Sequence, residues 1–89
     1  MCRNIKTLFN FEPPATDAEI EASALQFVRK ISGSTRPSKA NEQAFNDAVT
    51  AVSDAARTLL DALVTSAPPR NREVEAARAR ERAAQRFGR

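Results

Sequence analysis

The feature that most constrains the fold is a heptad-like apolar pattern in the second half of the chain. Its positions advance by alternating steps of four and three residues, at Phe45, Val49, Val52, Ala56, Leu59 and Leu63. This spacing forms one apolar stripe along a helix and is typical of a helix that packs against another helix. The pattern predicts a long helix over residues 39–65. That helix must end before Pro68 and Pro69, because a residue that precedes proline is pushed out of helical geometry.

A shorter helix is predicted over residues 17–32. Thr16 and Glu19 have the spacing of a capping box, in which a hydroxyl and a carboxylate bond free amides at the helix start. Apolar residues then recur with the period of one helix face, at Ile20, Ala24, Phe27, Val28 and Ile31. Gly33 follows, and glycine readily takes the left-handed conformation that ends many helices. The sequence therefore marks both ends of this helix.

The lengths of the two helices predict how they pack. At about 1.5 Å per residue, an antiparallel pair leaves about 16 Å of the longer helix uncovered. The uncovered end carries Leu59, Leu60, Leu63 and Val64. The segment that precedes the shorter helix is also apolar, at Ile5, Leu8, Phe9 and Phe11. We therefore expect an all-α fold, an antiparallel helical hairpin that the N-terminal segment completes by covering the free end of the long helix.

A third, basic helix is expected near the C-terminal end. Residues 71–87 are almost all strong helix formers, but their apolar content is mostly alanine, so this helix can bury little surface. Residues 68–89 hold seven arginines and three glutamates, whereas residues 1–67 hold seven basic and eight acidic residues. We interpret the chain as a single domain. Residues 1–67 form the hairpin core with its covering segment, and residues 68–89 form a Pro-Pro linker and an Arg-rich helix that docks loosely or projects.

The composition excludes several kinds of enzyme. The chain has no His, one Cys and two Gly, so it lacks the residues of a His-based catalytic triad, a His metal site or a glycine-rich phosphate loop. Asp47, Asp54 and Asp61 share one face of the long helix, but a spacing of seven residues puts them about 10 Å apart, too far for one metal ion. We therefore expect a non-catalytic protein without a metal or a cofactor.

Cys2 is the one candidate for a reactive thiol. Neighbouring Arg3 and Lys6 would favour its thiolate, and removal of Met1 would place it beside the α-amine, which could act as its base. The alternative is that this lone cysteine is a small buried apolar residue. The first residues lack the form of an export signal, and no stretch of about 18 apolar residues occurs, so we expect a cytoplasmic protein that does not enter membranes.

The basic tail is the leading candidate for a binding surface. Four of its arginines advance by four, four and three residues and form one stripe, and two more precede them; the six are Arg70, Arg72, Arg78, Arg82, Arg86 and Arg89. Such a stripe matches phosphates and predicts weak, sequence-independent association with nucleic acid or a ribonucleoprotein. The alternative is an ordinary solvated helix in which Glu75 and Glu81 pair with Arg78.

A second class of function remains open beside the first. If an apolar helix face stays exposed, the chain serves as a module for association with another protein or for homodimerisation. The two classes differ in their response to salt, because phosphate binding weakens as salt rises and apolar association does not.

Five stretches that span nearly the whole chain carry a family resemblance. They read Met-Cys-Arg-Asn-Ile, Phe-Glu-Pro-Pro-Ala-Thr, Leu-Gln-Phe-Val-Arg-Lys-Ile-Ser-Gly, Arg-Pro-Ser-Lys-Ala-Asn and Ala-Pro-Pro-Arg-Asn-Arg-Glu-Val-Glu-Ala. Together they resemble a bacterial family of short uncharacterised proteins, a domain of unknown function. Family members tend to have an aromatic residue where this chain has Ser34. The resemblance implies a bacterial protein and brings no activity, cofactor or partner with it.

Overall fold

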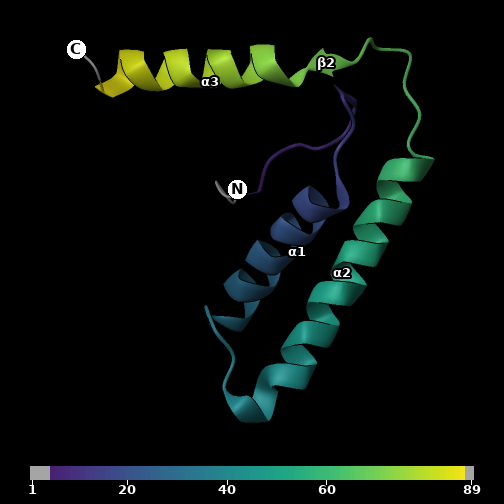
Figure 1. Ribbon diagram of the computed structural model, residues 1–89, viewed down its shortest axis with the longest axis vertical. Coiled ribbons are helices and arrows are strands. Elements are labelled where there is room, and N and C mark those ends of the chain that lie inside the picture. The colour runs from purple at the N-terminus through teal and green to yellow at the C-terminus, as the bar shows by residue number, and fades with distance from the viewer. Residues whose placement is uncertain (1–4, 88–89) are drawn as a thin grey trace.

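The computed structural model describes residues 5–87, which are mostly helical (Figure 1). Along the chain the elements are β1 (Phe11–Glu12), α1 (Asp17–Ser32), the 3-10 turn η1 (Lys39–Asn41), α2 (Glu42–Ala62), β2 (Arg70–Asn71) and α3 (Arg72–Phe87). The expectation of an all-α protein is therefore right in outline. The sequence did not predict β1 and β2, which form a small parallel two-stranded sheet.

Helix α1 has the bounds that its capping signals predict. The Thr16 hydroxyl accepts from the Glu19 amide at 3.2 Å, and the Glu19 carboxylate accepts from the Thr16 amide at 2.9 Å. At the other end Gly33 is left-handed, with φ of 69°, and its amide donates to the Arg29 carbonyl. Acidic residues lie in the first turn and basic residues in the last, which matches the helix dipole.

Helix α2 is shorter than predicted at both ends. Residues 39–41 form the 3-10 turn instead of the first α-helical turn, and Leu63 already has an extended backbone, with ψ of 139°. Residues 63–69 then connect α2 to β2 (Figure 1). The helix ends before the prolines require it to, because this connection has to carry the chain across to the strand beside β1.

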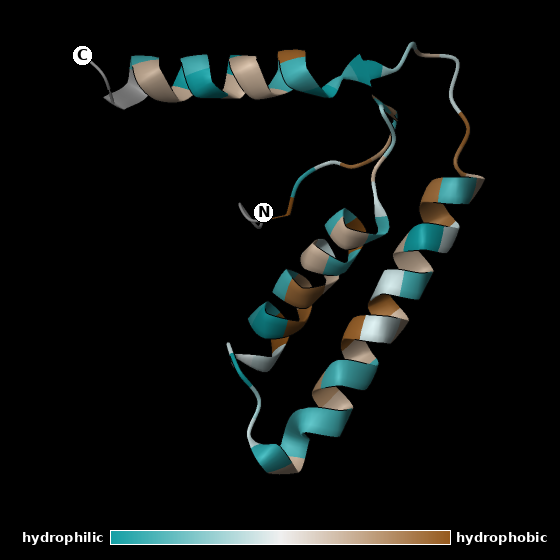
Figure 2. Ribbon diagram, viewed as in Figure 1, coloured by the Kyte–Doolittle hydropathy of each residue, from teal (hydrophilic) through white to brown (hydrophobic). Residues whose placement is uncertain are grey.

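Helices α1 and α2 lie side by side, and the hydrophobic residues of the structure gather on them (Figure 2). The fully buried core consists of Ile20, Ala24 and Val28, each exposed by 3% or less. Arg57 closes one edge of the contact, since its Nε donates to Asp17 at 3.2 Å and its Nη1 to Asp61 at 3.4 Å. Asp17 is the main reason why the pKa of Arg57 is raised.

The N-terminal segment does not cover the free end of α2, so that expectation was wrong. Leu59, Leu63 and Val64 are 56%, 41% and 91% exposed. The reason is that β1 pairs with β2, which holds the segment against the start of α3 instead. Only Leu60 of this end is half-buried, and it shares a hollow of about 200 Å³ with Phe9 and Phe11.

The protein is less compact than is usual for a chain of its length. Its accessible surface is 7175 Å², against about 5,100 Å² for a compact protein of this mass. Its radius of gyration is 15.8 Å, against about 12 Å for a compact chain of this length. Among the residues that the structure describes, no helix combines the length and the apolarity needed to cross a membrane.

A core this small makes each buried residue important. We expect Ile20→Ala to lower the free energy of unfolding by about 3 kcal/mol, because the substitution removes buried methyl groups and leaves a cavity. The matched control is Ile31→Ala on the same helix, where the side chain is 67% exposed and the loss should stay below about 1 kcal/mol. Urea denaturation followed by circular dichroism measures both. Equal losses would show that α2 does not cover Ile20.

Candidate functional site

The basic tail is joined to the rest of the protein by main-chain and side-chain hydrogen bonds around Asn10. Phe11 pairs with Arg70 and Glu12 with Asn71 in the parallel sheet, and the Arg70 amide donates to the Asn10 carbonyl at 2.8 Å. The Asn10 side-chain amide donates to the carbonyls of Ala67 and Pro68, at 3.4 and 3.1 Å. Asn10 has a φ of 64°, a left-handed conformation that Asn tolerates better than most residues. The N-terminal segment is therefore tied to the connection that precedes α3.

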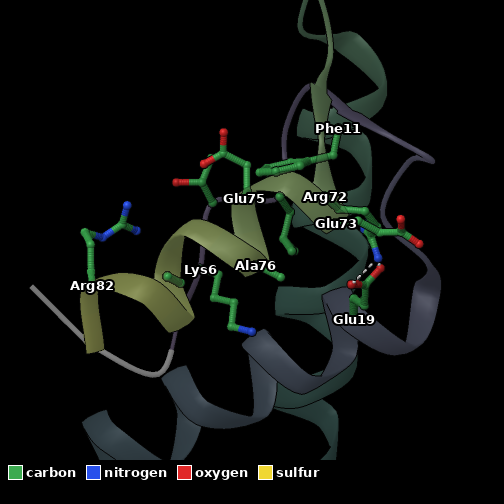
Figure 3. A pocket seen from close by; sticks show the side chains of 11 residues that line it. Lys6, Phe11, Glu19, Arg72, Glu73, Glu75, Ala76 and Arg82 are labelled. Carbon is green, nitrogen blue, oxygen red and sulfur yellow. Dashed lines mark hydrogen bonds and ion pairs between the residues drawn. The ribbon is translucent and has the colours of Figure 1, made fainter. Parts of the chain in front are cut away.

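A bidentate ion pair between Arg72 and Glu19 reinforces this junction (Figure 3). Arg72 Nη1 donates to Glu19 Oε2 at 2.9 Å, and Nη2 donates to Oε1 at 3.0 Å. The paired geometry matches the flat guanidinium to the flat carboxylate, so the contact is strong and directional. Arg72, followed by the Thr16 amide, lowers the pKa of Glu19 to about 2. Glu19 is thus ionised at neutral pH and acts as a counter-ion, not as an acid.

Arg70 forms a third contact between the basic tail and the rest of the protein, beside the Asn10 hydrogen bonds and the Arg72–Glu19 ion pair. Its guanidinium lies 5.4 Å from the centre of the Phe11 ring, within the range of a cation–π contact. Arg70 and Arg72 therefore both contact residues outside α3 and hold its start in place. Although the sequence groups these two residues with the other arginines of the tail, the structure separates them from the stripe.

The remaining arginines lie farther along α3. Asn71 caps the helix, since its Oδ1 accepts from the Val74 amide at 3.0 Å. Arg78 is 64% exposed and pairs at 3.5 Å with Glu75, the contact expected of a solvated helix. Arg82 is exposed as well. The backbone of Arg86 belongs to α3, whereas its side chain, Arg89 and Cys2 lie outside the described residues.

A groove of about 600 Å³ runs between α3 and the N-terminal segment (Figure 3). Its apolar lining comes from both sides, at Leu8, Phe11, Ala76 and Ala79. The Glu19–Arg72 pair stands at one end, and Arg82 is drawn at the other (Figure 3). Charges of both signs line the groove, and they include Lys6, Glu73 and Glu75. In the described part of the chain, Cys, Asp and Glu side chains nowhere gather in threes around a position for a metal ion.

Sequence reasoning missed the residues that position the tail. Glu19 was predicted to form the capping box, and that role alone explains a Glu at this position. Nothing in the sequence pattern indicates that Glu19 also pairs with Arg72. Asn10 carries a faint signal, because Asn is frequent at left-handed positions in turns. The pairing of β1 with β2 has no sequence signal at all, since two residues are too few to show an alternating pattern.

Comparison with known proteins identifies a family. The family model described as "Uncharacterized conserved protein (DUF2277)" matches residues 1–78, which include the helical pair, the junction at Asn10 and the first half of α3. No curated protein and no solved structure matches the chain.

We predict that Glu19→Gln loosens the start of α3 without disturbing α1. Gln keeps the capping box, because its side-chain oxygen can still bond the Thr16 amide, but it loses the charge and the bidentate contact to Arg72. Amide hydrogen exchange should therefore become faster in residues 72–75 and stay unchanged in residues 20–28. Glu21→Gln, an exposed carboxylate on the same helix, is the control. Equal exchange in the two variants would contradict the anchoring role of Glu19.

The same ion pair predicts a pH dependence. The folded protein lowers the pKa of Glu19 from 4.5 to about 2, so the pair contributes its full stability above about pH 4.5 and loses it as the pH falls toward 2. Carbon-13 NMR of the Glu19 carboxyl should give a midpoint near 2, and Arg72→Gln should move that midpoint toward 4.5. An unchanged midpoint in this variant would assign the shift to the capping box alone.

Proposed function

We propose that this chain, which belongs to the DUF2277 family of uncharacterised conserved proteins, is a non-catalytic helical module that binds nucleic acid weakly through the basic face of α3. The phosphate backbone is the expected target, and the base sequence has little influence, because arginine on phosphate carries no base information. The binding residues are Arg78, Arg82, Arg86 and Arg89. Arg70 and Arg72 support this surface by holding the helix start.

The observation that supports this proposal is the way α3 is attached. Its contacts to Asn10, Phe11 and Glu19 involve only β2 and the first residue of the helix. The rest of α3 extends away from α1 and α2 (Figure 1). Arg78 and Arg82 are exposed there, and the 3.5 Å contact of Arg78 with Glu75 is a long, exposed ion pair that competes weakly with a phosphate.

The proposed unit is a single domain. In it, residues 1–67 form an antiparallel helical hairpin together with the N-terminal segment, and residues 68–89 form the linker and the basic helix. We propose that the protein is bacterial and works in the cytoplasm, where nucleic acid and ribonucleoproteins are abundant. It carries no cofactor in this role.

A second candidate function is association with another protein. It is favoured by the exposed apolar side chains of the helical pair, which include Phe27, Ile31 and Leu59. Large apolar side chains left in water favour a partner that covers them.

Salt dependence tests nucleic-acid binding directly. Each phosphate neutralised on a duplex contributes about 0.9 to the slope of log K against log salt, so four arginines predict a slope near −3.6. Each single Arg→Gln change at residues 78, 82 or 86 should flatten the slope by about 0.9. Fluorescence anisotropy with a labelled DNA duplex and an RNA of unrelated sequence measures both quantities.

Charge reversal separates a local site from general attraction. Arg78, Arg82 and Arg86 changed together to Glu should abolish binding without lowering the melting temperature. The matched control changes Lys30, Arg36 and Lys39 to Glu, three exposed residues around the connection between α1 and α2. Both triple variants change the net charge from +3 to −3. If binding depends on a site on α3, the control variant still binds nucleic acid. If binding depends on net charge alone, neither variant binds. If the unmutated protein binds neither the DNA duplex nor the RNA at about 50 mM salt, the proposal is wrong.

A further inference from the structure

The groove between α3 and the N-terminal segment is large enough to hold a small ring. Its volume is about 600 Å³, and pockets that bind small molecules span about 300–1,000 Å³. Its apolar lining comes from Leu8, Phe11, Ala76 and Ala79. Leu8 and Phe11 are half-buried, whereas Ala76 and Ala79 are exposed, so part of this apolar lining is accessible from solvent.

The charges around the groove balance. Three basic and three acidic residues line it, and they are Lys6, Arg72, Arg82, Glu19, Glu73 and Glu75. Two of the carboxylates already have partners, because Glu19 pairs with Arg72 and Glu75 with Arg78. A lining without net charge attracts a phosphate weakly. It suits an uncharged ring, since burial of a charge in an apolar site costs free energy.

The basic face of α3 forms one border of the groove. Successive residues of a helix are separated by about 100°, so Arg82 lies about 60° around α3 from Ala79, and Arg78 lies about 100° from it on the same side. Arg82 also lines the groove. Both arginines are exposed. A ligand with an uncharged ring in the groove can therefore place an anionic group on these arginines.

Phe11 provides an aromatic surface on which such a ring can stack. Its side chain extends from β1 toward α3, near Glu75 (Figure 3). Arg70 lies over the ring, 5.4 Å from its centre, and can cover only one of the two ring faces. Every nucleic-acid base has a flat π face, so stacking on an aromatic side chain tolerates any sequence. The pairing of β1 with β2 thus brings an aromatic ring to the start of the basic helix.

We propose that the groove holds an unpaired base of a single-stranded nucleic acid whose phosphates contact Arg78 and Arg82. This inference rests on the proposed function and names its ligand, a single strand in preference to a duplex. Each nucleotide of a single strand presents an uncharged ring and an anionic phosphate, which match the groove and its basic border. The bases of a duplex are paired and stacked, and one enters a pocket only when it is flipped out at a cost in free energy.

The length of the groove fits a short run of nucleotides. Arg72 stands at one end and Arg82 at the other (Figure 3). These residues are ten positions apart on α3, which corresponds to about 15 Å. At about 3.4 Å for each stacked nucleotide, this distance covers about four nucleotides.

Fluorescence anisotropy with a labelled oligothymidylate of about 12 nucleotides, and with a duplex of the same length, tests the proposal. We expect the single strand to bind at least about threefold more tightly at equal salt. Ala79→Leu should weaken single-strand binding at least about fivefold, because the larger side chain occupies the groove, and should leave duplex binding unchanged. Leucine is a strong helix former, so α3 is retained. The substitution alters no charge, so the salt dependence should keep its slope.

The matched control is Ala77→Leu. It adds the same side chain to α3 at an exposed position outside the groove lining, about 160° around the helix from Ala79. We expect this variant to bind both polymers as the unmutated protein does.

Phe11→Leu tests the ring itself. It keeps an apolar side chain and the main-chain pairing of β1, but it removes the stacking surface, so single-strand binding should fall at least about fivefold. Because Phe11 also contacts Arg70, amide hydrogen exchange in residues 72–75 is measured beside it. If exchange there becomes faster, Ala79→Leu decides the outcome.

The outcomes separate the base site from phosphate binding. A preference for the single strand that Ala79→Leu removes and Ala77→Leu retains supports the proposal. Equal affinities for single strand and duplex, or equal effects of the two leucine variants, overturn the base site and leave phosphate binding by the arginines in place. If neither polymer binds at about 50 mM salt, the proposed function is wrong and the base site falls with it.

Discussion

The carboxylate of Glu19 is the interaction on which the arrangement of this chain depends. It closes the first turn of α1 by bonding the Thr16 amide, and it holds Arg72 at the start of α3 through two hydrogen bonds. Because one carboxylate bonds both helices, the start of α3 is held beside the start of α1. The adjacent strands and the Asn10 hydrogen bonds repeat the same connection in the main chain. Polar contacts therefore do here what a hydrophobic core does in most small domains.

An arrangement held by polar contacts gains little stability from the burial of apolar surface. Among the residues that the structure describes, Ile20, Ala24 and Val28 are buried, and burial of a side chain such as Ile or Val contributes about 1.5–3 kcal/mol. The half-buried residues of α2 add to the core, but Leu59 on the same helix contributes little while it is 56% exposed. An assembly that covers Leu59 and its neighbours would raise stability in proportion to the apolar area removed from water.

Local signals in the sequence predicted local structure well. The capping box at Thr16, Gly33 and the apolar periods identified α1 and α2, because each signal acts within a few residues of the element that it determines. The contacts of Arg70, Arg72 and Asn10 join residues more than fifty positions apart, and no local pattern encodes them. The covering role assigned to Phe9 and Phe11 failed for the same reason, since helix lengths alone do not say which of two apolar surfaces a loose segment will meet. The arginine stripe was visible in the sequence, but its division into anchoring and exposed residues required the fold.

The two proposed surfaces support one another. The exposed arginines Arg78 and Arg82 belong to α3, whereas the exposed apolar residues Phe27, Ile31 and Leu59 belong to α1 and α2, so association through the helical pair would leave the proposed phosphate-binding groups free. A dimer formed in this way carries two copies of α3. Because a second phosphate contact from the same particle forms at a high effective concentration, two weak sites bind a long polymer far more tightly than either does alone. A monomer offers one short basic helix that its own glutamates partly neutralise. Weak, sequence-independent contacts become useful on nucleic acid once they are paired, so the two proposals, protein association through the helical pair and phosphate binding through α3, are physically compatible.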